Sequence, residues 1–231
     1  MRALIFDCDG VLAETERDGH RAAFNRMFAA EGLDFEWTED DYDSVLSVAG
    51  GKERLRRLCT DAFVERHGLP TEQAALDELV ALWHRRKTQI FLDLVAEGRM
   101  PSRAGVRRLA SEARAAGWRL AVASTSAVVS VEAIAEQVLG RELLGECVIA
   151  AGDMVENKKP APDIYLHAAR LLGIDAYDAV AVEDSHVGVS AAVAAGMRVV
   201  ATVSHYTADE DLTAADIVVD GLGEPDGAAI A

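Results

Sequence analysis

Two aspartates separated by one residue follow a short apolar run near the start of the chain. Asp7 comes directly after Ala3–Phe6, and Asp9 stands two positions later, just before Gly10. Two carboxylates this close repel each other unless a cation lies between them or one of them is protonated. The pair therefore suits an oxygen-coordinated divalent ion such as Mg2+, or a carboxylate nucleophile beside a general acid/base. An ordinary Asp-Gly turn after a strand is the alternative for these residues alone.

Two later segments carry hydroxyl or ammonium groups beside a predicted strand or helix. One ends an apolar run and the other directly precedes a predicted helix. Ser124 and Thr125 end a second apolar run, where they could hold a phosphate or cap a helix that starts near Ala127. Lys159 stands just before a predicted helix, where its charge could stabilise a phosphoryl group and a nearby carboxylate. The alternative is that Lys159 and Lys158 form a solvated basic pair.

Two acidic residues follow a further apolar run. Glu183 and Asp184 could supply ligands to a cation beside the first two aspartates, or Asp184 or Ser185 could cap the next helix. Capping accounts for each segment separately but not for the joint occurrence of all of them. Because the carboxyl ends of parallel strands meet at one edge of a sheet, the set predicts a Mg2+-dependent phosphoryl-transfer site at that edge.

The segments that would position these residues alternate between strand and helix patterns. Near-continuous apolar runs are typical of strands buried on both faces. We predict strands at Ala3–Phe6, Arg119–Ala123, Cys147–Ala150, Ala179–Val182 and Arg198–Thr202. Helical patterns at Ala104–Ala116 and Pro160–Leu172 each end at a glycine, Gly117 and Gly173, as helix C-caps prefer. The alternation predicts an α/β fold with a doubly wound parallel sheet.

One long stretch contains only helical periodicity, including Asp18–Ala30, Lys52–His67 and Thr71–Glu97. We therefore predict an inserted helical cap subdomain over residues 16–95 and a core domain over residues 1–15 plus 96–231. The insert begins just after the first strand, and open α/β sheets bind ligands beyond the carboxyl ends of their strands. The cap is expected to cover the site.

The charge of the chain disfavours several kinds of partner. Its 231 residues include 23 lysines and arginines and 39 aspartates and glutamates, a formal net charge of −16. Such a chain repels nucleic acids and anionic membrane surfaces, so we expect neither as a partner. No apolar run is long enough for a membrane span or a signal-peptide core. Three scattered cysteines fit a reducing compartment. We expect a cytoplasmic monomer that binds a small anionic substrate through a metal ion or a local basic cluster.

The polar segments together resemble the motifs of the haloacid dehalogenase-like (HAD) hydrolase superfamily. The resemblance rests on Asp7-Cys8-Asp9-Gly10, Ser124 with Thr125, Lys159 in Lys-Pro-Ala-Pro-Asp, and Glu183-Asp184, and it covers essentially the whole chain. Residues 7–25, 49–55, 151–165 and 181–188 are more narrowly similar to the CbbY group of that superfamily. Members of this group resemble sugar-phosphate phosphatases of the Calvin cycle. They remove one phosphate from xylulose 1,5-bisphosphate, an inhibitor of Rubisco.

The resemblance implies roles in phosphoryl transfer for the matching residues. Asp7 would attack phosphorus and form an aspartyl-phosphate. Asp9 would protonate the leaving sugar oxygen and then deprotonate the attacking water. Ser124 and Lys159 would hold the phosphoryl oxygens, with Thr125 as a further substrate contact.

The resemblance also implies Mg2+ as the cofactor. Its ligands would be the Asp7 carboxylate, the Asp9 backbone carbonyl and Asp184, with Glu183 close by. The Arg-Pro-Gly that is common at the start of the second core unit reads Arg103-Ala104-Gly105 here. This departure weakens a rigid turn but removes no catalytic group.

Specificity must come from the cap, because the core motifs recognise only a phosphoryl group. Lys52, Arg54 and Lys87 form a local basic set that could clamp the second phosphate of a sugar bisphosphate. Glu16 and His20 would then contact sugar hydroxyls. The alternative is that these side chains belong to solvated helix faces.

Other functions remain open from the sequence. A β-phosphoglucomutase-like mutase or a phosphoglycolate phosphatase would share the core motifs, although Val128 stands where mutases often carry Asn. A dehalogenase needs the nucleophile but neither Asp9 nor Mg2+, and a non-catalytic relative would be expected to lack one of the motif residues. A thiol nucleophile at Cys8 is disfavoured, because strand alternation points this side chain into the core.

Overall fold

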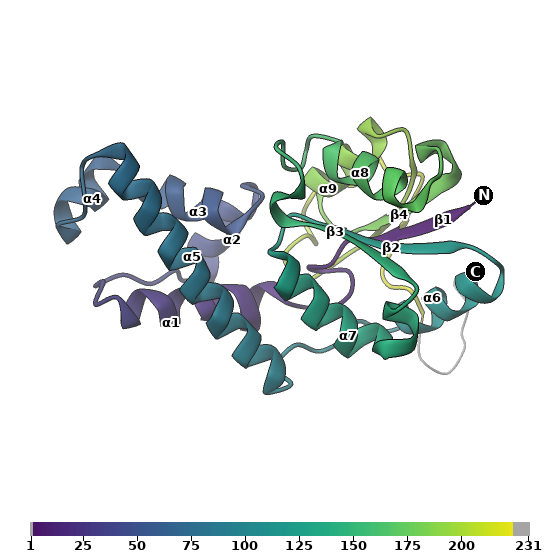
Figure 1. Cartoon of the computed structure of the whole chain (residues 1–231), viewed down its shortest axis with the longest axis horizontal. Helices are drawn as coiled ribbons and strands as arrows, with labels where there is room; N and C mark the ends of the chain where they lie inside the picture. Colours follow the sequence, from purple (N-terminus) through teal and green to yellow (C-terminus); the bar gives the residue numbers. More distant parts are fainter. Residues whose placement is uncertain (1, 224–231) are drawn as a thin grey trace. The chain divides into compact units, whose positions relative to one another are not determined.

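Six short strands form one parallel sheet in the order β3-β2-β1-β4-β5-β6 (Figure 1). The computed structural model describes residues 2–223. The strands are β1 Ala3–Phe6, β2 Arg119–Ser124, β3 Cys147–Ala151, β4 Ala179–Glu183, β5 Arg198–Thr202 and β6 Ile217–Val219. The predicted parallel sheet is confirmed. The sequence prediction lacks β6, a strand of three residues in which Ile217 and Val218 are exposed, so that no buried apolar run marks it.

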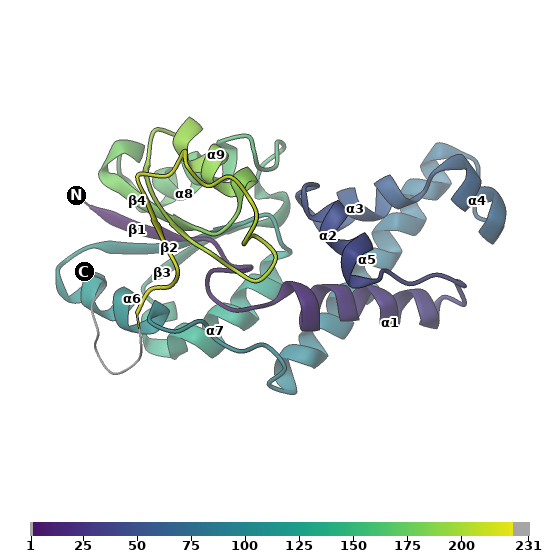
Figure 2. The same cartoon turned by 180° about the vertical axis from the view of Figure 1, so that it is seen from behind.

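Helices cover both faces of the sheet, α8 and α9 on one face and α6 and α7 on the other (Figures 1 and 2). These elements are α6 Val106–Ala115, α7 Val128–Leu144, α8 Asp163–Leu172 and α9 His186–Ala194, with short 3-10 turns at η2 Gly152–Met154 and η3 Ala176–Asp178. Alanines such as Ala121, Ala123 and Ala181 belong to the same buried cluster as Ile164 and Tyr165 of α8. Because alanine is small, these large helix side chains pack close to the sheet.

The predicted ends of the core helices are more accurate than their predicted starts. As predicted, α8 ends at Leu172, and Gly173 follows in a left-handed conformation with φ of 64°. The helix begins at Asp163, however, and not at Pro160. Pro162 occupies the N-cap position, and a residue that precedes proline disfavours helical dihedrals, so Ala161 stays outside the helix.

The chain divides into two compact units: a core unit of Met1–Thr15 with Met100–Ala231, and a cap unit of Glu16–Arg99. The cap unit contains the π-helical turn η1 Glu16–Arg21 and the helices α1 Ala22–Ala30, α2 Glu39–Leu46, α3 Gly51–Leu58, α4 Asp61–His67 and α5 Gln73–Ala96. The second boundary lies four residues beyond the proposed one (99 against 95). The reason is local: the amides of Gly98 and Arg99 bond back to the carbonyls of Val95 and Leu94, so these residues still belong to the end of α5.

Aromatic side chains fill the interior of the cap unit. Phe24 and Phe28 of α1 contact Trp37 edge to face, with ring centroids 4.9 and 5.1 Å apart. The predicted helix Lys52–His67 is two helices, α3 and α4. The chain breaks between them because the Thr60 hydroxyl accepts a hydrogen bond from the Phe63 amide and caps α4. Among the described helices none is both long and apolar enough to cross a membrane.

The two segments that lead from the core unit to the cap unit and back lie side by side. Ala13 forms an antiparallel bridge with Ser102. Next to this bridge, the Arg103 guanidinium donates to the carbonyl of Gly10 at 2.8 Å and to that of Val203 at 2.6 Å. Arg103 therefore ties the loop after β1 to the end of β5.

Candidate active site

Asp7 begins the loop that follows β1, at the carboxyl edge of the sheet. Its backbone amide donates to the Val182 carbonyl of β4 at 2.9 Å, so the strand pairing extends to this residue. Gly10 then turns the chain with a φ of 78°, and a Cβ atom there would lie 1.9 Å from Asp184 Oδ2. Only glycine permits both this turn and the approach of Asp184. The backbone thus brings Asp7 and Asp184 together where the strand order reverses, between β1 and β4.

Lys159 reaches Asp7 from a different element. Its Nζ lies 2.6 Å from Asp7 Oδ1 and 2.6 Å from Glu183 Oε1, and the side chain is only 6% exposed. The neighbouring Lys158 points elsewhere and pairs with Asp153 at 3.1 Å. The two lysines therefore do not form a solvated basic pair, and Lys159 is a buried partner of two carboxylates.

Three buried carboxyl groups meet at the site. One oxygen from each of Asp7, Glu183 and Asp184 lies within 4.8 Å of the others. The cap of α9 is supplied by Ser185, whose hydroxyl accepts from the Gly188 amide at 3.1 Å. Asp184 is therefore not needed for capping and belongs to the acidic cluster.

The electrostatics of this cluster follow from burial. Burial raises the pKa of Asp7 to about 8 against the lowering effect of Lys159, with Glu183 and Asp9 adding to the rise. Burial also raises the pKa of Asp184 well above its usual value, and Glu183 and Asp7 act in the same direction. For Lys159, burial alone would lower the pKa, but Asp7 and Glu183 raise it well above the usual value. The ammonium group is thus held in its charged form.

The donor set of the cluster fits Mg2+. Three carboxyl groups face one ammonium group, so the buried site contains more acidic groups than Lys159 can neutralise. All of the candidate ligand atoms are oxygens, the donors that this hard cation prefers. A divalent cation would supply the missing positive charge and favour the ionised carboxylates.

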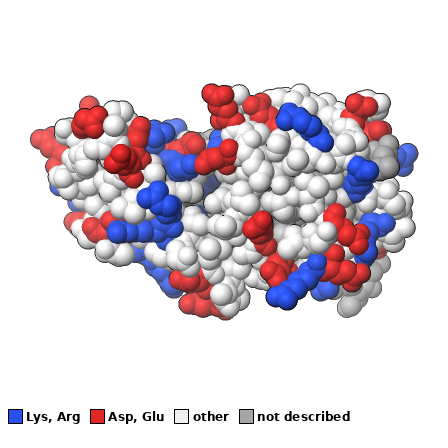
Figure 3. Space-filling view, in the orientation of Figure 1, with Lys and Arg blue, Asp and Glu red and all other residues white. Residues whose placement is uncertain are grey.

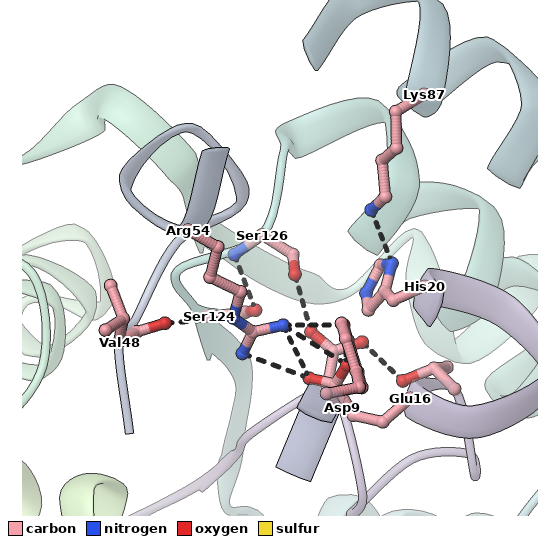
Figure 4. Close-up of polar contacts among 10 residues, drawn as sticks. Asp9, Glu16, His20, Val48, Arg54, Lys87, Ser124 and Ser126 are labelled. Carbon is pink, nitrogen blue, oxygen red and sulfur yellow. Dashed lines mark hydrogen bonds and ion pairs between the residues drawn. The ribbon is translucent and has the colours of Figure 1, made fainter. Parts of the chain in front are cut away.

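Asp9 is held by two hydroxyl groups of the core unit. Ser126 Oγ donates to Asp9 Oδ2 at 2.5 Å (Figure 4). Thr15 Oγ1 donates to Asp9 Oδ1, also at 2.5 Å. Ser124 Oγ in turn accepts from the Ser126 amide at 3.1 Å, and Thr125 is half-buried between these serines. No side chain among them caps α7. The capping alternative for this segment is therefore wrong, and the Ser126 hydroxyl contacts Asp9 instead.

Cys8 lies between the two aspartates in sequence but not in the site. Its side chain is 1% exposed and belongs to the apolar core, as strand alternation predicts. A thiol nucleophile at this position has no support from the structure.

Much of the basic charge of the cap unit lies beside acidic residues, and side chains of both signs are interspersed over the visible surface (Figure 3). Arg56 pairs with Asp77 at 2.8 Å, and Arg86 pairs with Glu31. Lys52 lies half-buried in the first turn of α3. The Arg56 and Arg86 ion pairs involve exposed arginines, and ion pairs at the surface of helices contribute little to stability.

Arg54 differs from these surface arginines because it is the centre of a polar cluster within the cap unit (Figure 4). Its guanidinium lies 3.3 Å from the Glu16 carboxylate, 2.8 Å from the Tyr42 hydroxyl and 2.9 Å from the Val48 carbonyl. Tyr42 donates in turn to Glu16 at 2.6 Å. Two of the predicted specificity residues, Glu16 and Arg54, are therefore brought together although 38 positions separate them.

Lys87 and His20 form a second buried contact in the cap unit (Figure 4). Lys87 Nζ lies 2.7 Å from His20 Nδ1, and it also lies over the rings of Phe24 and Phe91. With Lys87 as an ammonium group, which can only donate, Nδ1 is the acceptor and a neutral imidazole carries its proton on Nε2. Lys87 is 5% exposed, so it does not belong to a solvated helix face.

Several residues that shape the site are absent from the sequence prediction. Ser126 and Thr15 hold Asp9, and Tyr165 contacts both Glu183 and Lys159. Ser126 directly follows two predicted site residues, Ser124 and Thr125. This adjacency is the feature of the sequence that could have marked Ser126 as a site residue. Tyr165 stands on the apolar face of α8, where periodicity indicates a core residue and gives no sign of a polar role.

Comparison with known proteins identifies the class to which this fold and site belong. The model of the haloacid dehalogenase-like hydrolase family matches residues 1–196, and the chain belongs to this family. It is 44% identical to a CBBY-like protein of Arabidopsis thaliana over 96% of this chain and 70% of the relative. It is 43% identical to protein CbbY of Cereibacter sphaeroides over 99% of this chain and 96% of the relative.

A solved structure agrees with these relatives. The crystal structure of a CbbY variant from Rhodobacter sphaeroides, in complex with xylulose 1,5-bisphosphate, superposes with a TM-score of 0.83 at 41% identity and covers 100% of both chains. Within its family the chain is a phosphatase of the CbbY type.

Proposed function

We propose that the protein hydrolyses a sugar bisphosphate, most specifically xylulose 1,5-bisphosphate, with Mg2+ and through an aspartyl-phosphate. The observation that carries this proposal is the buried Asp7 carboxylate, held by Lys159 beside Glu183 and Asp184. A carboxylate in this position can attack phosphorus, and the surrounding charges can stabilise the transferring group.

The proposed reaction has two steps at Asp7. An Asp7 oxygen attacks phosphorus while the bond to the sugar oxygen breaks, and Asp9 gives its proton to that oxygen. Water then attacks the aspartyl-phosphate, Asp9 takes the proton of the water, and the Asp7 carboxylate is released with inorganic phosphate. Ser124, Thr125 and Lys159 hold the phosphoryl oxygens during both steps.

The contacts of Asp9 suit a group that changes its protonation state. As a carboxylate it accepts hydrogen bonds from Thr15 and Ser126. Hydroxyl groups can also accept, so either one can reverse its role when Asp9 is protonated. The same two partners can therefore hold Asp9 as an acid in the first step and as a base in the second.

The metal site in this proposal uses the Asp7 carboxylate, the Asp9 backbone carbonyl and Asp184, with Glu183 close by. When bound, Mg2+ would neutralise charge that develops on the phosphoryl oxygens. The experiment is phosphate release from a panel of sugar phosphates, with and without EDTA. Full activity in EDTA would overturn the proposed cofactor, and conversion of a sugar phosphate without phosphate release would indicate a mutase.

Replacing Asp184 by alanine is expected to raise the Mg2+ concentration for half-maximal activity by more than about tenfold, because a carboxylate of the cluster is lost. Ca2+ is expected to inhibit, since its coordination is looser and longer than that of Mg2+. Titration of activity with each cation measures both effects. An unchanged Mg2+ requirement in the variant would remove Asp184 from the metal site.

The proposed substrate requires a positive cap. We propose that Lys52, Arg54 and Lys87 supply charge for the second phosphate, while Glu16 and His20 contact sugar hydroxyls. Support comes from the relatives above, one of which has been crystallised with xylulose 1,5-bisphosphate, and from the polar cluster that orients Arg54. Lys87 has the further role of fixing the His20 proton on Nε2, so that this nitrogen can donate to a hydroxyl.

Replacing Lys52 or Arg54 by alanine is expected to lower kcat/KM for the bisphosphate by tenfold or more, because a charged contact contributes roughly 1.5–3 kcal/mol. Turnover of p-nitrophenyl phosphate should change little, since it has no second phosphate. Arg57→Ala is the matched control, an exposed cation on the same helix. If both substrates are affected alike, or neither is, the two residues are not the specificity contacts.

A role in the Calvin cycle would follow from the proposed substrate. The three cysteines are scattered along the sequence without paired spacing, and we propose a reducing compartment such as the cytoplasm. We expect a monomer, a state that size-exclusion chromatography with light scattering would test.

A further inference from the structure

The Tyr165 hydroxyl makes buried contacts with Glu183 and Lys159, the two residues that lie next to each other beside Asp7. The hydroxyl donates to Glu183 Oε1 at 2.5 Å and accepts from Lys159 Nζ at 3.3 Å. The ammonium group also lies 4.9 Å from the centre of the Tyr165 ring. Tyr165 and Glu183 are both 0% exposed, so these contacts do not compete with bulk water.

The Glu183 carboxylate is held on several sides. Oε1 accepts from Tyr165 and Lys159, and Oε2 accepts from the Asp184 amide at 3.0 Å. A Cβ atom on Gly188 would lie 2.0 to 2.1 Å from this carboxylate, so the absence of a side chain there leaves the space that Glu183 occupies. The orientation of Glu183 therefore depends on α8 and α9 as well as on its own strand.

From these contacts we propose that Tyr165 is a positioning residue: by orienting Glu183 it holds the Lys159 ammonium group against Asp7. This inference rests on the phosphatase function proposed above. The hydrogen bonds of the Tyr165 hydroxyl go to Glu183 and Lys159.

The proposed reaction changes one of the two carboxylates that hold Lys159, so the contact with Glu183 becomes important for its position. The lysine side chain is long and flexible, and in the resting site two carboxylates hold its ammonium group. When Asp7 becomes an acyl-phosphate, the negative charge moves from its carboxylate to the phosphoryl oxygens, and Lys159 has to shift from the carboxylate toward those oxygens. Glu183 then remains the carboxylate bonded to Lys159, and the Tyr165 hydroxyl keeps its Oε1 in place.

The test is Tyr165→Phe, which keeps the ring and its packing and removes only the hydroxyl. We expect kcat for a sugar phosphate to fall about tenfold, the lower end of the loss that removal of an outer contact causes. KM should change by less than about threefold, because the phosphoryl-binding groups remain. Tyr177→Phe is the matched control, since this exposed tyrosine lies on η3 and outside the site; its kcat should equal that of the unmodified protein.

Two further measurements separate positioning from a general loss of structure. Gly188→Ala should also lower kcat, because the new methyl group displaces Glu183, whereas Gly221→Ala, with no atom within 4 Å of the added carbon, should not. The 15N resonance of the Lys159 ammonium group, assigned by its loss in Lys159→Met, should shift or broaden in Tyr165→Phe and in Gly188→Ala but not in the controls.

The outcomes distinguish this inference from the function on which it rests. Full turnover in Lys159→Met would contradict the proposed role of Lys159 and with it the proposed mechanism. An inactive Lys159→Met combined with unchanged kcat in Tyr165→Phe would overturn the positioning role alone. A double variant Glu183→Gln/Tyr165→Phe should be no slower than Glu183→Gln, and multiplied losses would show that Tyr165 does not act through Glu183.

Discussion

Asp7→Asn is expected to retain less than about one hundredth of the normal turnover while the fold stays intact. An amide cannot form the acyl-phosphate, so the nucleophilic step is lost. Asparagine has nearly the same shape as aspartate and can still accept a hydrogen bond from Lys159, which lies 2.6 Å from Asp7 Oδ1. Steady-state phosphate release measures the loss, and circular dichroism with thermal unfolding checks the fold.

Two controls make the Asp7 result decisive. Mass spectrometry of the purified variant must exclude slow deamidation of the asparagine back to aspartate, which would produce a small active fraction. Rapid acid quenching of the unmodified protein with substrate should reveal a phosphorylated peptide that contains residue 7. Appreciable turnover in a variant free of deamidation would remove covalent catalysis by Asp7.

Asp9→Asn is expected to slow the hydrolysis of sugar phosphates by about 100- to 10,000-fold, the usual contribution of general acid/base catalysis. The loss should be smaller for p-nitrophenyl phosphate, whose leaving group needs little protonation. Comparison of kcat/KM for the two substrates in the two proteins gives the result. Equal losses on both substrates would show that Asp9 does not protonate the leaving group.

Ser126→Ala is a second, milder substitution that tests the same role of Asp9. It removes one of the two hydroxyls that hold Asp9 and keeps the carboxylate itself. The same substrate comparison should therefore show a loss in the same direction but smaller than that of Asp9→Asn. This outcome would connect the geometry of Asp9, and not only its charge, with the leaving-group step.

The sequence predicts the sheet well because strands buried on both faces consist of continuous apolar runs, which are easy to recognise. Ala3–Phe6 and Arg198–Thr202 have the predicted bounds. Predictions fail where a local contact outweighs periodicity. The Thr60 cap divides one predicted helix into α3 and α4, and Pro162 delays the start of α8. Such breaks depend on single hydrogen bonds and dihedral restrictions, which a hydrophobic pattern does not record.

Some residues of the site can also be predicted from the sequence, whereas others depend on packing. Asp7 and Asp184 follow neighbouring parallel strands, so topology alone brings their backbones together. Tyr165 and Ser126 were not predicted, because their polar contacts depend on how a helix and a loop pack against those strands. The pairing of Arg54 with Glu16 could not be predicted either, since it requires the fold of the cap unit to be known.

The position of β1 in the sheet has a consequence for the way the protein is made. Of the described strands β1 is synthesised before the others, yet it lies in the interior of the sheet between β2 and β4. The carboxylate of Asp7 meets Lys159 across 152 positions, and Glu183 follows later still. A nascent chain therefore carries the Asp7 carboxylate well before the groups that surround it in the folded protein. Fragments that end before β4 lack Glu183 and Asp184, so from the function proposed above we expect them to have no hydrolytic activity.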